Sequence, residues 1–127
     1  MRLVVEAEDL EGAVAFYRDT LGLEESLAVD SEDGARVVIL EAGRATLELI
    51  NPAQRRLIDD LEVGREVSRS IRVAFEVDDG PGATRDLIAA GAELLAAPVE
   101  TPWHSLNSRL EGPAGLQLTL FQQLQPE

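Results

Sequence analysis

The sequence predicts an α+β domain made of two copies of one β-α-β-β-β unit, and three observations lead to this prediction. Residues 9–23 have the spacing of a capped amphipathic helix between two extended segments. The same markers return 69 residues later, where Asp78 and Gly91 correspond to Asp9 and Gly22. Most other segments are short, β-branched and separated by turns. Two such units in 127 residues predict one pseudo-symmetric domain rather than two unrelated helices.

The first unit is expected to occupy residues 1–51. A strand is expected over 3–8, and Asp9 can cap a helix over 10–21 because its carboxylate can accept a hydrogen bond from a free amide of the first turn. Gly22 ends this helix, since glycine adopts a left-handed conformation at little cost. The elements expected next are an extended segment at 23–29, a turn at 30–34, and strands at 36–40 and 45–50 around a tight connection at 42–44.

A linker over residues 52–69 is expected to carry a short helix at 54–61, with Leu57, Ile58 and Leu61 facing inward. A second unit over 70–122 repeats the pattern. Pro81 suits the first turn of the second helix. The expected elements are a strand at 70–77, a helix at 81–90 ended by Gly91, an extended segment at 93–99, a strand at 103–110, a turn at 112–115 and a strand at 116–121. We expect the chain to fray from Gln122 onward, leaving a tail at 123–127.

The composition is typical of a globular protein, with 45% hydrophobic residues. No apolar run approaches the roughly 20 residues that span a bilayer, so we expect no contact with membranes. Acidic residues occur close to the N-terminal Met, and this excludes a secretory signal peptide. The absence of cysteine excludes disulfides, thiolate nucleophiles and zinc–sulfur sites. We therefore expect a cytoplasmic protein.

The net charge is −13, and all 11 basic residues are arginine. Such a chain repels phosphate backbones, which excludes nucleic acid as a partner. An acidic surface can attract a cationic small molecule or a basic protein. It can also serve solubility alone.

Two motifs carry a family resemblance. The first is Asp-Leu-x-x-Ala-x-x-Phe-Tyr-x-Asp-x-Leu-Gly-Leu over residues 9–23, and the second is Glu100-x-Pro-Trp103 followed by Arg-Leu-Glu-Gly-Pro-Ala-Gly-Leu-Gln-Leu over 109–118. Both resemble the vicinal oxygen chelate superfamily, which includes glyoxalase I, extradiol dioxygenases, and fosfomycin- and bleomycin-resistance proteins. This resemblance covers essentially the whole chain. It implies two βαβββ modules whose curled mixed sheet forms a cup, usually completed in a homodimer.

The resemblance also implies a metal site with four positions, one on the first and one on the last strand of each module. Here these positions fall at or near Arg2, Glu48, Arg72 and Thr119. Only Glu48 is a competent ligand, because arginine does not release its proton to coordinate a metal. Moving the first-strand positions by one residue does not supply a metal ligand, since the neighbouring residues are Met1, Leu3, Ile71 and Val73. We therefore expect no metal and no cofactor; a weaker alternative is a carboxylate site built from Glu6, Glu48 and Glu76.

In place of a metal, we expect the guanidinium of Arg72, and less strongly that of Arg2, to lie near Glu48 in the cup. Arg72 could neutralise the Glu48 carboxylate or receive an anionic group of a ligand. An ordinary surface ion pair is the alternative.

Other candidate binding residues are Trp103, Asn107 and Thr119, which fall on alternating positions expected to line the cup. Trp103 could stack on a ligand or pack in the core. His104 is the only histidine and a weaker candidate; it could act as a general base or be structural. We assign no catalytic residue.

The sequence thus favours a metal-free small-molecule binding protein, with an unidentified ligand that the acidic balance suggests is cationic, acting as a homodimer. One alternative is a metal-dependent lyase, isomerase or dioxygenase of the same superfamily. Another is a dimeric structural or regulatory module. Whether the modules pair within one chain or by exchange between chains stays open at this point.

Overall fold

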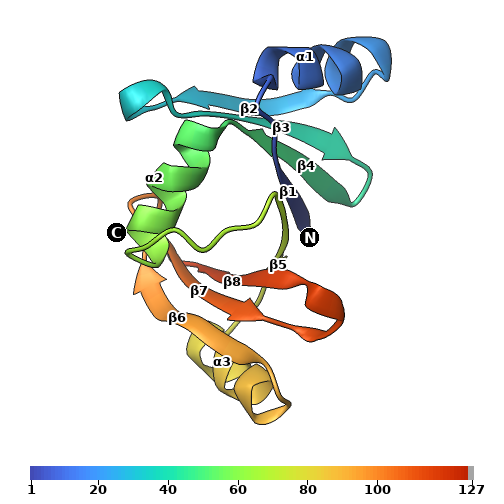
Figure 1. The fold of residues 1–127 in the computed structure, drawn as a ribbon. Helices are drawn as coiled ribbons and strands as arrows, with labels where there is room; N and C mark the ends of the chain where they lie inside the picture. Colours follow the sequence, from blue (N-terminus) through green and yellow to red (C-terminus); the bar gives the residue numbers. More distant parts are fainter. Residues whose placement is uncertain (126–127) are drawn as a thin grey trace.

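The computed structural model describes residues 1–125, and within this range eight strands form one curled, unclosed mixed sheet (Figure 1). The strand order is β2-β3-β4-β1-β5-β8-β7-β6. The strands are β1 (Arg2–Glu6), β2 (Glu25–Asp30), β3 (Arg36–Ala42), β4 (Ala45–Ile50), β5 (Ile71–Glu76), β6 (Glu93–Glu100), β7 (Ser105–Glu111) and β8 (Gln117–Gln123). The helices are α1 (Leu10–Val14), which continues as the π-helical segment η1 (Ala15–Thr20), α2 (Pro52–Glu62) and α3 (Gly80–Ala89). Two short 3₁₀ turns, η2 (Glu32–Gly34) and η3 (Pro113–Gly115), lie in hairpin connections.

The predicted α+β fold of two βαβββ modules is confirmed. In each half the first strand pairs parallel with the last, so Val4 lies opposite Glu48 and Ala74 lies opposite Thr119. The halves join through the antiparallel pair of β1 and β5, in which Val4 faces Arg72. The two modules therefore build one continuous sheet within a single chain.

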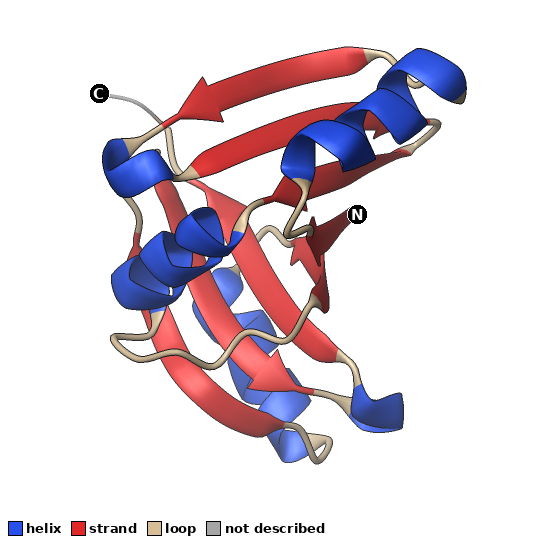
Figure 2. Ribbon diagram, turned by 45° about the horizontal axis from the view of Figure 1, so that its top comes forward, coloured by secondary structure: helices blue, strands red, loops and turns tan. Residues whose placement is uncertain are grey.

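The helices lie on both faces of this sheet. Figure 2 shows α2 and α3 on opposite faces of the second half, and Figure 1 shows α1 over the outer face of the first half. On the outer face, Leu10 and Val14 of α1 pack against Val38, Leu40 and Leu49. Side chains alternate along a strand, so the residues between these, such as Ile39 and Glu48, point to the concave side. The linker helix α2 also lies on the concave side and extends from one half of the sheet to the other (Figure 1).

The helix caps correct the predicted repeat by one residue. Asp9 caps α1 by accepting a hydrogen bond from Gly12 N at 3.0 Å, as expected. In the second half the cap is Asp79, which accepts from Gly82 N at 3.1 Å, and not Asp78. The first strands and the caps are therefore offset by 70 residues, while the two stop glycines remain offset by 69. The first helical segment holds one residue more, and a π-helical turn such as η1 accommodates it.

Several predicted boundaries also change. Trp103 lies in a turn before β7 rather than in the strand, and His104 adopts a left-handed conformation with φ of 64°. The linker helix starts at Pro52 because Asn51 caps it, accepting from Gln54 N at 2.9 Å. Fraying from Gln122 was wrong, since β8 runs to Gln123; residues 126–127 of the expected tail lie outside the described residues. Among residues 1–125, no helix combines the length and apolar character needed to cross a membrane.

The cap of α3 gives a testable prediction. A Cβ added to Gly82 would collide with the Asp79 carboxylate, so Gly82→Ala should displace the cap and lower the free energy of unfolding. Asp79→Ala should cost about 1 kcal/mol for the same reason. In the Asp79→Ala background the collision is absent, and alanine should be tolerated or stabilising by up to about 1 kcal/mol. Urea denaturation of the wild type, the two single variants and the double variant measures this coupling. Losses that simply add in the double variant would contradict the prediction.

Candidate functional site

The concave side of the sheet holds a cavity of about 430 Å³. Its floor is formed by alternate residues of the central strands, and α2 contributes one wall. The four positions predicted for a metal site, Arg2, Glu48, Arg72 and Thr119, all line this cavity. The strand register explains this convergence, because the four residues lie on the same face of β1, β4, β5 and β8.

Arg72 is buried in the centre of the site. Only 6% of the residue is exposed, and its Nη1 donates a hydrogen bond to Thr119 Oγ1 at 2.8 Å. Burial lowers the pKa of Arg72 to about 10, and the nearby charge of Arg109 acts in the same direction. Arg72 nevertheless stays protonated at neutral pH. Its side chain is therefore a cation held inside the cavity and not directed into bulk water.

Glu48 lies on the other side of β1 from Arg72. Both residues are opposite Val4, so two strand spacings, about 10 Å, separate their backbones. Among the described residues, no ion pair joins them and the Glu48 carboxylate has no hydrogen-bond partner. Burial raises the pKa of Glu48, and the charge of Glu62 adds to this, while Arg72 and Arg2 oppose it. The expected direct pairing is thus not formed, and Glu48 presents a free carboxylate to the cavity.

Arg2 is the second cation of the cavity. Its guanidinium carbon lies 4.6 Å from the centre of the Phe121 ring, which also lines the cavity. This cation–π contact fixes the side chain over the inner face of β8. Among the described residues the Arg2 guanidinium makes no hydrogen bond or ion pair, so its N–H groups remain available to a ligand.

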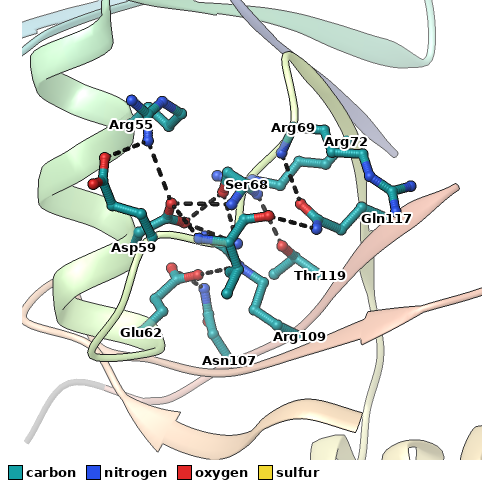
Figure 3. A network of polar contacts seen from close by, with 12 residues as sticks. Arg55, Asp59, Glu62, Ser68, Arg69, Arg72, Asn107, Arg109, Gln117 and Thr119 are labelled. Carbon is teal, nitrogen blue, oxygen red and sulfur yellow. Dashed lines mark hydrogen bonds and ion pairs between the residues drawn. The ribbon is translucent and has the colours of Figure 1, made fainter. Parts of the chain in front are cut away.

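A buried ionic network closes one end of the cavity (Figure 3). Arg109 of β7 is fully buried and pairs with two acids of α2: its Nε lies 2.8 Å from Glu62 Oε1, and its Nη1 lies 3.3 Å from Asp59 Oδ1. Asn107 donates to Glu62 Oε2 at 2.9 Å, and Ser68 donates to Asp59. Both carboxylates are satisfied, and they hold the linker helix against the second half of the sheet.

Sequence reasoning missed this network. The linker helix was expected to bury Leu57, Ile58 and Leu61, but Leu61 is 40% exposed while Asp59 and Glu62 are buried beside Ile58. A usable signal was present, because two acids three residues apart share one helix face with Ile58. Arg109 alternates along its strand with Ser105 and Asn107, and it supplies the counter-charge of both acids.

Other predicted residues have different places. Trp103 is 45% exposed and lines the rim of the cavity rather than the core. Asn107 lines the cavity, but its amide is used, since Nδ2 binds Glu62 and Oδ1 accepts from Ser105 at 2.6 Å. His104 is exposed in the turn before β7 and does not line the cavity. Gln54 of α2 was not predicted; it is 8% exposed, lines the cavity, and its Oε1 has no partner among the described residues.

The donor set does not fit a divalent cation. Two of the four superfamily positions are guanidiniums, and the Thr119 hydroxyl is bound to one of them. The alternative site of Glu6, Glu48 and Glu76 is wrong, because Glu6 pairs with Arg55 at 2.9 Å and Glu76 is exposed. Within residues 1–125, no three His, Cys, Asp or Glu side chains come together as a metal site requires.

A model of the glyoxalase-like domain family matches residues 2–121, so the chain belongs to this family. A hypothetical protein from Bacillus halodurans C-125 shares the fold with a TM-score of 0.73 and 16% identity over 99% of this chain and 94% of that one.

Two further structures are methylmalonyl-CoA epimerases. The one from Mycobacterium tuberculosis has a TM-score of 0.69 and 19% identity over 98% of this chain and 87% of its own. The one from Streptomyces coelicolor, in complex with 2-nitronate-propionyl-CoA, has a TM-score of 0.66 and 23% identity over 96% of this chain and 94% of its own. Such identities show a common fold alone. A comparison with curated proteins finds no match.

The Arg109 network predicts a large effect of one substitution. Arg109→Met removes the counter-charge of two buried carboxylates, so the free energy of unfolding should fall by about 3–5 kcal/mol. The matched control is Arg36→Met, because Arg36 pairs with Asp30 and Glu11 at the surface, where ion pairs contribute less than about 1 kcal/mol. Urea denaturation measures both. If Arg109→Met lowered the free energy of unfolding as little as Arg36→Met does, the network would not be important for stability.

Proposed function

We propose that this protein binds a small molecule in the cavity of its sheet without the help of a divalent cation. The observation that carries the proposal is the placement of two guanidiniums, those of Arg2 and Arg72, in the cavity. The resemblance to the vicinal oxygen chelate superfamily implies a metal at these positions. Fixed cations there repel a divalent ion and offer hydrogen-bond donors to a ligand instead.

The cavity supports this proposal by its size and lining. A volume of about 430 Å³ lies in the range of roughly 300–1,000 Å³ that is typical of small-molecule sites. Apolar side chains such as Val4, Ile39 and Phe121 make up half of the lining residues, and polar or charged side chains make up the other half. Such a lining suits an organic ligand that carries both an apolar body and a polar group.

Each candidate residue has a proposed role. Arg72 and Glu48 meet the polar end of the ligand, and Thr119 orients Arg72 through its hydrogen bond. Trp103 covers the ligand at the rim. Asn107 acts indirectly, because its amide holds Glu62 in the network beside the cavity.

Metal analysis tests the proposal. Protein purified without chelator should contain well below one equivalent of zinc, nickel, iron or manganese, and adding these metals should not raise its melting temperature. A ligand that prefers the folded state should raise it, and a thermal-shift screen finds such compounds. One stoichiometric metal that is lost in Glu48→Gln would overturn the proposal.

We further propose that the protein acts as a cytoplasmic homodimer. Strand β2 is exposed along its whole length and forms one edge of the sheet, and its Leu27 and Val29 reach the cavity from this open side. An unpaired edge with exposed apolar side chains favours cover by a second chain. The absence of cysteine suits the reducing cytoplasm.

Light scattering tests the dimer. The wild-type protein should have twice the chain mass of 13.8 kDa, and Leu27→Glu should shift it toward the monomer because it places a charge in the covered surface. Arg44→Glu, at the exposed turn between β3 and β4, is the control that should leave the mass unchanged. A wild-type monomer at micromolar concentration would contradict the assignment.

A further inference from the structure

The polar groups of the cavity differ in how many hydrogen bonds and ion pairs they make within the protein. Asp59 and Glu62 are satisfied by Arg109, Ser68 and Asn107. By contrast, the guanidinium of Arg72 uses one of its N–H groups, for Thr119, and that of Arg2 meets a ring face. Glu48 has no partner among the described residues. The charged groups left for a ligand are therefore two guanidiniums and one carboxylate.

The strand register brings these three groups to one place. Arg2 lies opposite Ala74 and Arg72 lies opposite Val4, so the two arginines are diagonal neighbours on adjacent antiparallel strands. Such positions are about 7–8 Å apart at the backbone, within reach of long side chains toward a common point. Glu48 is next to Val4 on the other side of β1.

Resting on the proposed function, we infer that the cavity binds a monocarboxylate and that Glu48 takes up a proton when it binds. The ligand carboxylate lies between the guanidiniums of Arg72 and Arg2. Its apolar body lies against Val4, Ile39 and Phe121. Protonated Glu48 then donates a hydrogen bond to the bound anion instead of repelling it.

The charges around the site favour this ligand class over others. A cation would meet two guanidiniums at close range, which disfavours it despite the acidic surface of the protein. Gln54 adds a buried amide without a partner at its Oε1, and this group can bond a polar atom of the ligand.

The charges that face Glu48 are Arg2 on β1, Arg72 on β5 and Glu62 on α2. Burial already raises the pKa of Glu48, and a ligand carboxylate that shares its two arginines adds negative charge beside it. The pKa of Glu48 is then higher in the complex than in the free protein. Binding therefore takes up protons, and the affinity falls as pH rises through the range in which free Glu48 ionises.

A matched series of probes tests the inference by calorimetry: 3-phenylpropanoate, its neutral amide and the 3-phenylpropylammonium ion, with hexanoate and hexanamide as an aliphatic pair. At about pH 6 at least one carboxylate should bind about tenfold or more tightly than its amide, and the ammonium ion should bind most weakly. The affinity of the carboxylate should fall toward about pH 8, although the ligand stays ionised throughout.

Variants separate the roles of the three groups. Glu48→Gln should bind the carboxylate more tightly than the wild type at about pH 8 and should lose the pH dependence; misfolding cannot produce such a gain. Arg72→Gln should lose the preference for carboxylate over amide. If this buried substitution prevents folding, Arg2→Gln should reduce the same preference. Arg44→Gln, an exposed arginine outside the cavity, should change nothing.

The outcomes distinguish the inference from the proposed function. An amide or ammonium ion that binds as tightly as the carboxylate overturns the inference but keeps a metal-free binding protein. No binding of either carboxylate at millimolar concentration also overturns it, and hits from the thermal-shift screen then decide the proposed function separately. If Glu48→Gln binds the carboxylate with the same pH dependence as the wild type, Glu48 is not the group that takes up the proton.

Discussion

The buried contact of Arg109 with Asp59 and Glu62 is the constraint on which the site depends. A fully buried guanidinium needs paired charges and hydrogen bonds, and Arg109 obtains them through Nε and Nη1, while its Nη2 has no partner among the described residues. Because the acids belong to α2 and the arginine to β7, the network fixes the linker helix on the concave side of the sheet. Without it, the wall of the cavity that carries Gln54 and Ile58 would not be held in place.

The same network determines which groups remain free for a ligand. It satisfies two acids that could otherwise have paired with Arg72, and this leaves the cavity with unmatched cations around Glu48. In a protein with a net charge of −13, two of the three charged groups that stay unpaired in the cavity are thus cations. The total charge describes the surface and does not identify the ligand, since short distances and low dielectric dominate inside the cavity.

The sequence predicted the architecture well, because hydrophobic periodicity, caps and stop glycines are local signals. It also predicted which strand positions converge, since alternation along β1, β4, β5 and β8 follows from strand geometry. It failed for α2, where apolar residues were assumed to face inward. Burial of Asp59 and Glu62 depends on Arg109, about 50 residues further along the chain, and no local pattern reports such a pairing.

The junction of β1 and β5 has a stereochemical consequence. Arg2 and Arg72 still occupy equivalent places in the two halves, but the equivalents on the last strands have become Glu48 and Thr119. Two identical halves would offer a ligand the same surroundings in either of two orientations related by the pseudo-twofold axis. One acidic and one hydroxyl side chain remove that equivalence, so a bound molecule has a single favoured direction, and its two faces meet different chemistry.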